Sequence, residues 1–136
     1  MKRIFLALAL YAAPSLAAAP TVAPLATTDQ TVIGQPIEVP QHPTVIATVI
    51  TFQPGDKTAV HKHLYPHYGY MLEGTLTIVN TATGKTFALK AGDFLVEMID
   101  TYHFGENRGT TPVRMLVIDQ VPPGVDKNSM PRASGN

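Results

Sequence analysis

Short runs of β-branched and apolar residues, separated by glycine, proline and polar turns, make up most of the chain after its N-terminal segment. Such runs predict β-strands, and beyond the N-terminal segment we find no window with the period of an amphipathic helix. The predicted strands cover residues 44–53, 75–79, 86–89, 94–97, 102–104 and 113–121. Many short strands at close spacing are typical of a β-sandwich or a closed barrel, so the pattern predicts an all-β domain.

Proline and polar residues set the expected limits of this domain. Residues 18–34 are rich in alanine, threonine and proline without a period, which predicts a linker. Residues 35–40 are an extended segment with two prolines, which suits an edge strand. The polar residues 122–136 predict a flexible C-terminal tail. We therefore expect the folded domain over residues 35–121.

The first residues have the three parts of a secretory signal peptide. Two basic residues precede an apolar run at residues 4–13, and small residues follow it. We expect cleavage after Ala17, because cleavage after Ala19 would place Pro20 beside the scissile bond. The apolar run is too short for a permanent membrane span. The pattern predicts that residues 1–17 are removed and that the mature protein is secreted or periplasmic, without a membrane partner.

Composition and charge exclude several classes of partner and of metal ligand. The 136 residues are 45% hydrophobic and 15% charged, as in one globular domain. Ten basic residues balance ten acidic ones, and loss of the signal peptide would leave eight against ten. We therefore expect no nucleic-acid partner, because a basic surface is missing. The absence of cysteine excludes disulfides and thiolate ligands, so any metal must be held by nitrogen and oxygen atoms.

Four of the five histidines are spaced so that the fold can bring them together. His61 and His63 point to the same face of an extended strand, about 6–7 Å apart. His67 follows on the next segment, and His103 comes from a separate predicted strand. Imidazole is the commonest protein metal ligand, and buried imidazoles without a metal would each need their own hydrogen-bond partners. The pattern indicates a metal site, with a metal-free binding pocket as the alternative. We expect His42, beside a proline, to be exposed.

The first half of this pattern resembles the first motif of the cupin superfamily. Gly55 is followed after five residues by His61 and His63, which have one residue between them. Three further residues lead to position 67, and six more lead to Gly74. This chain has His67 where the family usually has glutamate.

The second cupin motif is also recognisable. Gly92, His103 and Asn107 keep its spacing. Met98 stands at the usual proline position, and Asp100 stands at the usual glycine position. Two motifs in the expected order are far more specific than either one alone, so the resemblance is strong for the fold.

The resemblance covers about residues 35–121 and implies a double-stranded β-helix, a jelly-roll barrel of two antiparallel sheets with a metal inside. The implied ligands are His61, His63, His67 and His103. A neutral nitrogen in place of the family's carboxylate shifts the preference from Mn²⁺ toward Cu²⁺, Ni²⁺, Zn²⁺ or Fe²⁺. If His67 instead points away, three histidines leave open positions that suit oxygen activation. The sequence leaves both arrangements open.

Other residues are candidates for the surroundings of the metal. Met71 would line the cavity by strand parity, and Met98 would lie near its mouth if the second motif is followed, although both also fit an ordinary core. Glu73, Glu97 and Asp100 are candidate acids or bases. No residue receives a catalytic assignment from the sequence.

These observations predict an exported, metal-binding cupin with two competing functions. The first is an enzyme acting on a small organic molecule, with dioxygenase-like oxidative cleavage as the subclass that the resemblance implies. The second is a non-catalytic periplasmic protein that binds a metal or small ligand, and a structural subunit is a third possibility. The resemblance also implies a homodimer, and the apolar residues on both faces of segment 113–118 agree with a covered sheet face.

Overall fold

The structure is a computed structural model that describes residues 19–133, so the signal peptide predicted at residues 1–17 lies outside the described residues. The described chain contains nine β-strands. Within it, no helix is long and apolar enough to cross a membrane. The strands are β1 (Thr44–Phe52), β2 (His61–His63), β3 (His67–Glu73), β4 (Thr75–Asn80), β5 (Thr86–Lys90), β6 (Phe94–Val96), β7 (His103–Glu106), β8 (Val113–Val121) and β9 (Ser129–Pro131). The predicted all-β class is confirmed.

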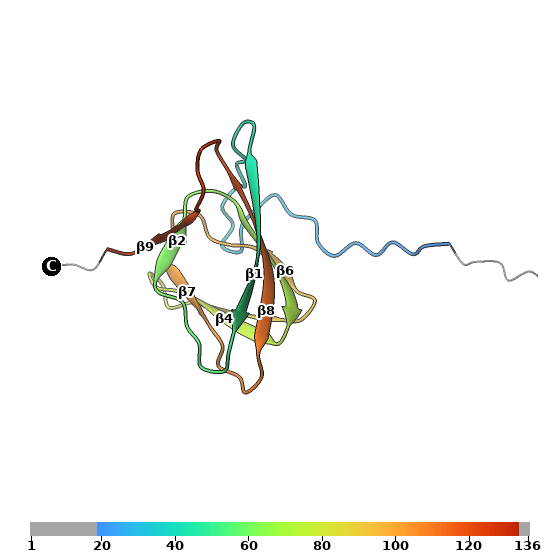
Figure 1. Cartoon of the computed structure of the whole chain (residues 1–136), viewed down its shortest axis with the longest axis vertical. Helices are drawn as coiled ribbons and strands as arrows, with labels where there is room; N and C mark the ends of the chain where they lie inside the picture. The colour runs from blue at the N-terminus through green and yellow to red at the C-terminus, as the bar shows by residue number, and fades with distance from the viewer. Residues whose placement is uncertain (1–18, 134–136) are drawn as a thin grey trace, which may run out of the picture.

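The strands form two antiparallel sheets that face each other (Figure 1). One sheet has the order β1-β8-β3-β6, and the other has the order β5-β4-β7-β2-β9. The longest pairing joins β1 to β8 over nine residue pairs, from Thr44 opposite Val121 to Phe52 opposite Val113. This arrangement is consistent with the expected jelly-roll barrel. Apart from β4 and β5, the paired strands of the described chain are not consecutive in sequence, so the fold brings remote segments to the same interior.

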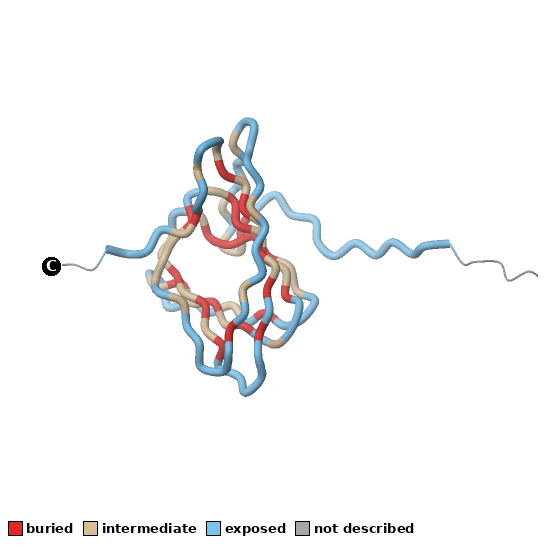
Figure 2. The backbone as a smooth tube through the Cα atoms, viewed as in Figure 1, coloured by how far each residue is buried: buried red, intermediate tan, exposed pale blue. Residues whose placement is uncertain are grey.

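Alternation of side chains along the strands creates that interior. In β8 every second residue, Val113, Met115, Val117, Asp119 and Val121, is buried, whereas the residues between them are half-buried or exposed. This is the period of two expected of a strand with one face on a core. Figure 2 shows buried positions gathered on the inner side of both sheets. The core cluster comprises Phe52, Met71, Leu76, Ile78, Leu89, Leu95, Met98, Val113, Met115 and Val117.

Two turns of the recognised motifs need unusual backbone angles. Gly74 has a φ of 77°, and a Cβ added there would lie 2.6 Å from the carbonyl oxygen of Pro112. Only glycine fits this position. Asp100, at the usual glycine position of the second motif, has a φ of 48°. Aspartate tolerates this left-handed conformation better than most residues, which explains how the turn is kept without glycine.

The C-terminal part of the expected linker is integrated into the domain. The backbone nitrogen of Val32 donates to the carbonyl oxygen of Val96, and Val32 and Ile33 pack against the core. The edge strand predicted over residues 35–40 is reduced to one bridge between Gln30 and Pro36. The prolines of this segment lack backbone donors, which limits its pairing. The residues from 19 to 28 are exposed and outside the strands.

The C-terminal segment also differs from the expected flexible tail. Residues 129–131 form strand β9, which pairs with β2 and lies beside it in Figure 1. Asn128, just before β9, is buried. The sequence signal was weak because β9 is a three-residue edge strand that ends in a proline, and such a strand is defined by its partner. The segment from 122 to 131 therefore forms part of the barrel wall next to the histidine-bearing strand.

Candidate metal centre

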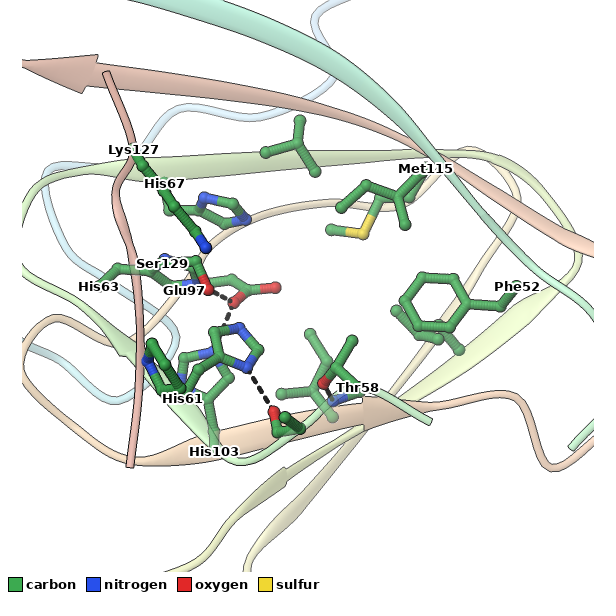
Figure 3. Close-up of a pocket in the computed structure, with 17 residues that line it drawn as sticks. Phe52, Thr58, His61, His63, His67, Glu97, His103, Met115, Lys127 and Ser129 are labelled. Carbon is green, nitrogen blue, oxygen red and sulfur yellow. Dashed lines mark hydrogen bonds and ion pairs between the residues drawn. The ribbon is translucent and has the colours of Figure 1, made fainter. Parts of the chain in front are cut away.

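Neighbouring strands bring three of the predicted ligands together. Strand β2 pairs with β7 so that His61 lies opposite His103, and His63 is two residues further along β2. The ring centroids are 4.6 Å apart for His61 and His103, and 5.0 Å apart for His63 and His103. Potential ligand atoms of these three histidines lie within 4.8 Å of one another. This cluster can bind a metal ion, and Figure 3 shows its rings converging.

Backbone carbonyl groups orient two of these rings. The Nδ1 atom of His61 lies 2.8 Å from the carbonyl oxygen of Ala59, and the Nδ1 atom of His103 lies 2.8 Å from that of Thr101. A carbonyl oxygen only accepts, so both Nδ1 atoms carry the proton. The Nε2 atom of each neutral ring then has a free lone pair, which is the usual arrangement of a metal-ligating histidine.

Glu97 lies between the histidines, as Figure 3 shows. Glu97 follows directly after β6 in the chain, and its side chain is almost fully buried. Its Oε2 atom is 2.8 Å from Nε2 of His103 and 3.2 Å from Nε2 of His63. The sequence named Glu97 only as one of three candidate acids or bases. Its signal was a lone carboxylate in the apolar run from Phe94 to Met98, but no recognised motif linked it to the histidines.

His67 has a different environment from the other three histidines. Its Nδ1 atom lies 2.7 Å from Oδ1 of Asp119 on β8. Its ring stacks on that of His63, with centroids 3.8 Å apart and planes 8° from parallel. His63, His67 and Asp119 form a second group of potential ligands. The assignment of all four histidines as metal ligands remains a prediction.

Asn128 holds Asp119 in place. Its Nδ2 atom donates to Oδ1 of Asp119 at 2.6 Å and to the carbonyl oxygen of Tyr65 at 3.0 Å. Its Oδ1 atom accepts from the backbone nitrogens of Leu64 and Tyr65. Sequence reasoning missed both Asp119 and Asn128, since neither belongs to a motif. The only signal was a carboxylate on the inward parity of a strong strand.

The buried charges shift one another's pKa values. Burial alone would raise the pKa of Glu97, but the surrounding histidines, led by His67, hold it well below its usual range. Burial lowers the pKa values of His61 and His63. For His67 and His103 the nearby carboxylates outweigh burial and raise the pKa. The site therefore contains an ionised carboxylate that is stabilised by positive charge, from protons or from a metal.

The histidine cluster forms one end of a cavity of about 280 Å³. Phe52 and Met115 lie at the other end (Figure 3). Lys127 and Ser129, from the segment around β9, also line the cavity. The apolar lining residues are Ile50, Phe52, Ala59, Leu76, Ile78, Met115, Val117 and Pro131. The site thus joins a polar, ligand-bearing end to an apolar chamber.

The structure places the remaining sequence candidates away from this cavity. Met71 and Met98 are completely buried in the core, and neither is among the cavity-lining residues. The parity argument gave the correct inward face for Met71, which belongs to the core cluster and not to the cavity lining. Glu73 and Asp100 are exposed, so Glu97 is the candidate acid that faces the cavity. His42 is exposed, as expected.

The donor set fits a divalent transition metal. Within the described chain, two buried side-chain atoms have no hydrogen-bond partner, and they are Nδ1 of His63 and Nε2 of His103. The second atom is 2.8 Å from Oε2 of Glu97 but forms no hydrogen bond with it. Imidazole nitrogens with carboxylate oxygens suit zinc, copper, nickel and iron, and the carboxylate also suits manganese.

Comparison with known proteins gives a family match. The model of the Cupin domain family matches residues 48–119, which is more than half of the chain. A search of curated proteins found no match. Among solved structures, the chain is similar to the polyketide cyclase RemF from Streptomyces resistomycificus, with 20% identity and a TM-score of 0.56. That match covers 67% of this chain and 62% of the cyclase, and at this identity it supports the fold alone.

Two oxalate decarboxylases are also similar. The formate complex of the enzyme from Lactobacillus farciminis has 26% identity and a TM-score of 0.55, over 65% of this chain and 26% of that chain. The enzyme from Bacillus subtilis, which has Mn(II) centres, has 27% identity and a TM-score of 0.51, over 57% and 22%. The present chain therefore spans about a quarter of the decarboxylases and less than two thirds of the cyclase.

Proposed function

The chain belongs to the cupin family, and on that premise we propose that it is a metal-dependent enzyme acting on a small organic molecule. One observation carries the proposal: His61, His63, His103 and Glu97 converge at one end of a cavity whose other end is apolar. The similar decarboxylases are enzymes, and the one from Bacillus subtilis has Mn(II) centres.

His61, His63 and His103 would hold one divalent metal, with iron, copper, nickel or zinc as the proposed ions. Such a metal, when bound, supplies a Lewis acid or a centre for oxygen activation. The chain's own residues orient these ligands through the carbonyl groups of Ala59 and Thr101. The apolar walls restrict the access of water to the reacting end.

The lining of the cavity defines a class of substrate. Its volume of about 280 Å³ is just below the range of about 300–1,000 Å³ typical of small-molecule sites, so the substrate is compact. Phe52 and Met115 provide apolar contact at the far end. Lys127 is the lysine among the cavity-lining residues, and its ammonium group can pair with an anionic oxygen. We propose an enolate or carboxylate on a mainly apolar body.

Oxidative cleavage of an enol is the reaction that we propose within this class. Dioxygen is the oxidant, the carbon–carbon double bond is broken, and each carbon receives one oxygen atom. The products are a carbonyl compound and a carboxylic acid. Lys127 would hold the anionic oxygen of the substrate. His67, whose Nδ1 atom is engaged by Asp119, would present Nε2 as the ring nitrogen that exchanges a proton with the substrate.

Metal analysis tests the site, and oxygen uptake tests the reaction. Protein purified from the exported fraction should carry about one metal per chain, and His61→Ala and His103→Ala should each lose it, whereas the exposed control His42→Ala should keep it. Unchanged metal content in both site variants would refute the assignment. Oxygen consumption is then measured with flavonols, diketones and enols for each metal. Lys127→Ala should raise KM more than it lowers kcat for anionic substrates.

A non-catalytic metal carrier is the second candidate. It is favoured by the presence of two adjacent groups of potential ligands, which share His63. An enzyme needs an open coordination position, whereas several ligands can close a storage site. Absence of turnover with every tested metal, together with tight stoichiometric binding, would support the carrier and contradict the enzyme.

We also propose export and homodimerisation. The sequence of residues 1–17 supports export, and N-terminal sequencing of periplasmic protein should start at Ala18. A second copy would cover the outer face of the first sheet, where Val45 and Val49 are 59% and 48% exposed. Leu116, opposite Val49 on β8, extends this apolar strip. Sedimentation as a monomer at micromolar concentration would contradict the dimer.

A further inference from the structure

We infer that Glu97 is the anionic ligand of the metal centre and that His67 lies outside the coordination shell. The inference rests on the proposed metal site at His61, His63 and His103. It assigns the carboxylate ligand to a variable position of the second motif, between Gly92 and Met98. In the first motif, the position where the cupin resemblance expects glutamate is occupied by His67.

The spacing of Glu97 from its neighbours is that of ligands on one ion. Its Oε2 atom is 2.8 Å from Nε2 of His103 and 3.2 Å from Nε2 of His63. Ligand atoms that each lie about 2.0–2.2 Å from a metal are themselves about 3.0–3.5 Å apart in octahedral or tetrahedral geometry. The carboxylate oxygen therefore already lies at about the separation from both nitrogens that a shared metal requires.

The lone pairs at this point call for a cation. His103 carries its proton on Nδ1, where it faces the carbonyl oxygen of Thr101. In the neutral ring, Nε2 then has only a lone pair, and it faces the oxygen of Glu97 at 2.8 Å. Two acceptor atoms at this distance repel each other unless a proton or a metal lies between them. The site is thus built for a positive ion between Glu97 and His103.

The ring of His67 is turned away from the same ion. The lone pairs of an imidazole lie in the plane of its ring. The planes of His67 and His63 are 8° from parallel with centroids 3.8 Å apart, so their lone pairs run side by side. The potential ligand atoms of His67 group with those of His63 and Asp119 and not with those of His61 and His103. Asp119 holds the Nδ1 atom of His67 at 2.7 Å, and Asn128 in turn holds Asp119 at 2.6 Å. This chain of contacts fixes the stacked orientation.

A carboxylate ligand changes the expected metal. Four neutral histidines would disfavour Mn²⁺, whereas three histidines with Glu97 include a hard anionic oxygen that Mn²⁺ and Fe²⁺ accept well. Glu97 also cancels one of the two positive charges of the ion. The donor set therefore predicts measurable Mn²⁺ binding that depends on the charge of residue 97.

Metal titration of the mature chain tests the inference. Mn²⁺ binding is followed by the electron paramagnetic resonance of the free ion, and Zn²⁺ binding by competition with a chromophoric chelator. Glu97→Gln should weaken Mn²⁺ binding by more than about 100-fold, because even outer partners of metal ligands contribute about 10–100-fold. Glu97→Asp should retain part of the affinity. His67→Gln should lose less than about tenfold, and the exposed control Glu73→Gln should match the parent.

The opposite pattern, with binding lost in His67→Gln and kept in Glu97→Gln, would overturn the inference and return the fourth ligand to the first motif. Failure of the proposed metal site itself would give a different result, because His61→Ala and His103→Ala would then bind the metal as well as the parent does. Circular dichroism of each metal-free variant identifies misfolding. If Glu97→Gln is unfolded, the intermediate affinity of Glu97→Asp decides between ligation and a structural role.

Discussion

Replacing Asn128 with alanine should destabilise the whole barrel, although this residue lies in a segment whose composition is that of a tail. The side chain is buried and forms four hydrogen bonds. Their partners are the backbone nitrogens of Leu64 and Tyr65, the carbonyl oxygen of Tyr65 and the carboxylate of Asp119. These bonds join the C-terminal segment to the turn between β2 and β3.

The magnitude follows from these four bonds. Each contributes about 0.5–1.5 kcal/mol, and the bond to a charged carboxylate contributes more. Water can replace part of the contact near Leu64, which is exposed. We therefore expect Asn128→Ala to lower the free energy of unfolding by about 2–4 kcal/mol, which lowers Tm by more than about 8 °C in a domain of this size.

Urea denaturation of the metal-free mature chain at pH 7 measures this loss. Met130→Ala, an exposed position on β9, is the matched control and should change stability by less than about 0.5 kcal/mol. A loss below about 1 kcal/mol for Asn128→Ala would refute the reasoning, because it would mean that the segment is not anchored by this side chain. The ring nitrogens of His67 in NMR spectra give a second measurement, since release of Asp119 should alter their tautomer balance.

Three further perturbations follow from the same structure. Gly74→Ala should lower the free energy of unfolding by about 2–4 kcal/mol, because it combines the penalty of a positive φ with a Cβ clash against a carbonyl oxygen at 2.6 Å. The control Gly84→Ala, with a φ of 72° and open space around the Cβ, should lower it by only about 1 kcal/mol. Equal losses in urea denaturation would exclude the clash. The hydrogen bond to His67 lowers the pKa of Asp119 against the effect of burial, and nearby carboxylates raise the pKa of His67. The stabilisation from this pair is therefore present above the ordinary carboxyl pKa and below the ordinary imidazole pKa, and is lost outside that window. The stability difference between the parent and Asp119→Asn in metal-free protein should be largest between about pH 4 and 6.5; a difference that is flat with pH would contradict the pairing. Addition of Zn²⁺ at 100 times its Kd should stabilise the parent by about 2.7 kcal/mol and leave the Tm of His103→Ala unchanged; an equal shift in both would place the zinc elsewhere.

Local pattern determined the strands and the positions of the turns. The apolar run over residues 113–121 predicted β8 with its observed bounds, and the prediction for residues 44–53 differs from β1 by one residue. These predictions succeed because the two-residue period of a strand and the conformational demands of Gly74 are properties of a few neighbouring residues. The spacing of the histidines likewise predicted the convergence of His61 and His63, since one strand positions both.

The partners of each buried group were decided by the tertiary structure. Glu97 meets His63 across 34 residues of sequence, and Asp119 meets His67 across 52. Strand parity gives the face on which a side chain lies, but the opposing sheet supplies the group that it meets. The same limit applies to Asn128 and β9, whose order comes from pairing with β2. The sequence alone thus determined the barrel and the type of site, because these depend on local period and residue chemistry. The tertiary structure decided which carboxylate lies among the histidines, because that depends on contacts between remote strands.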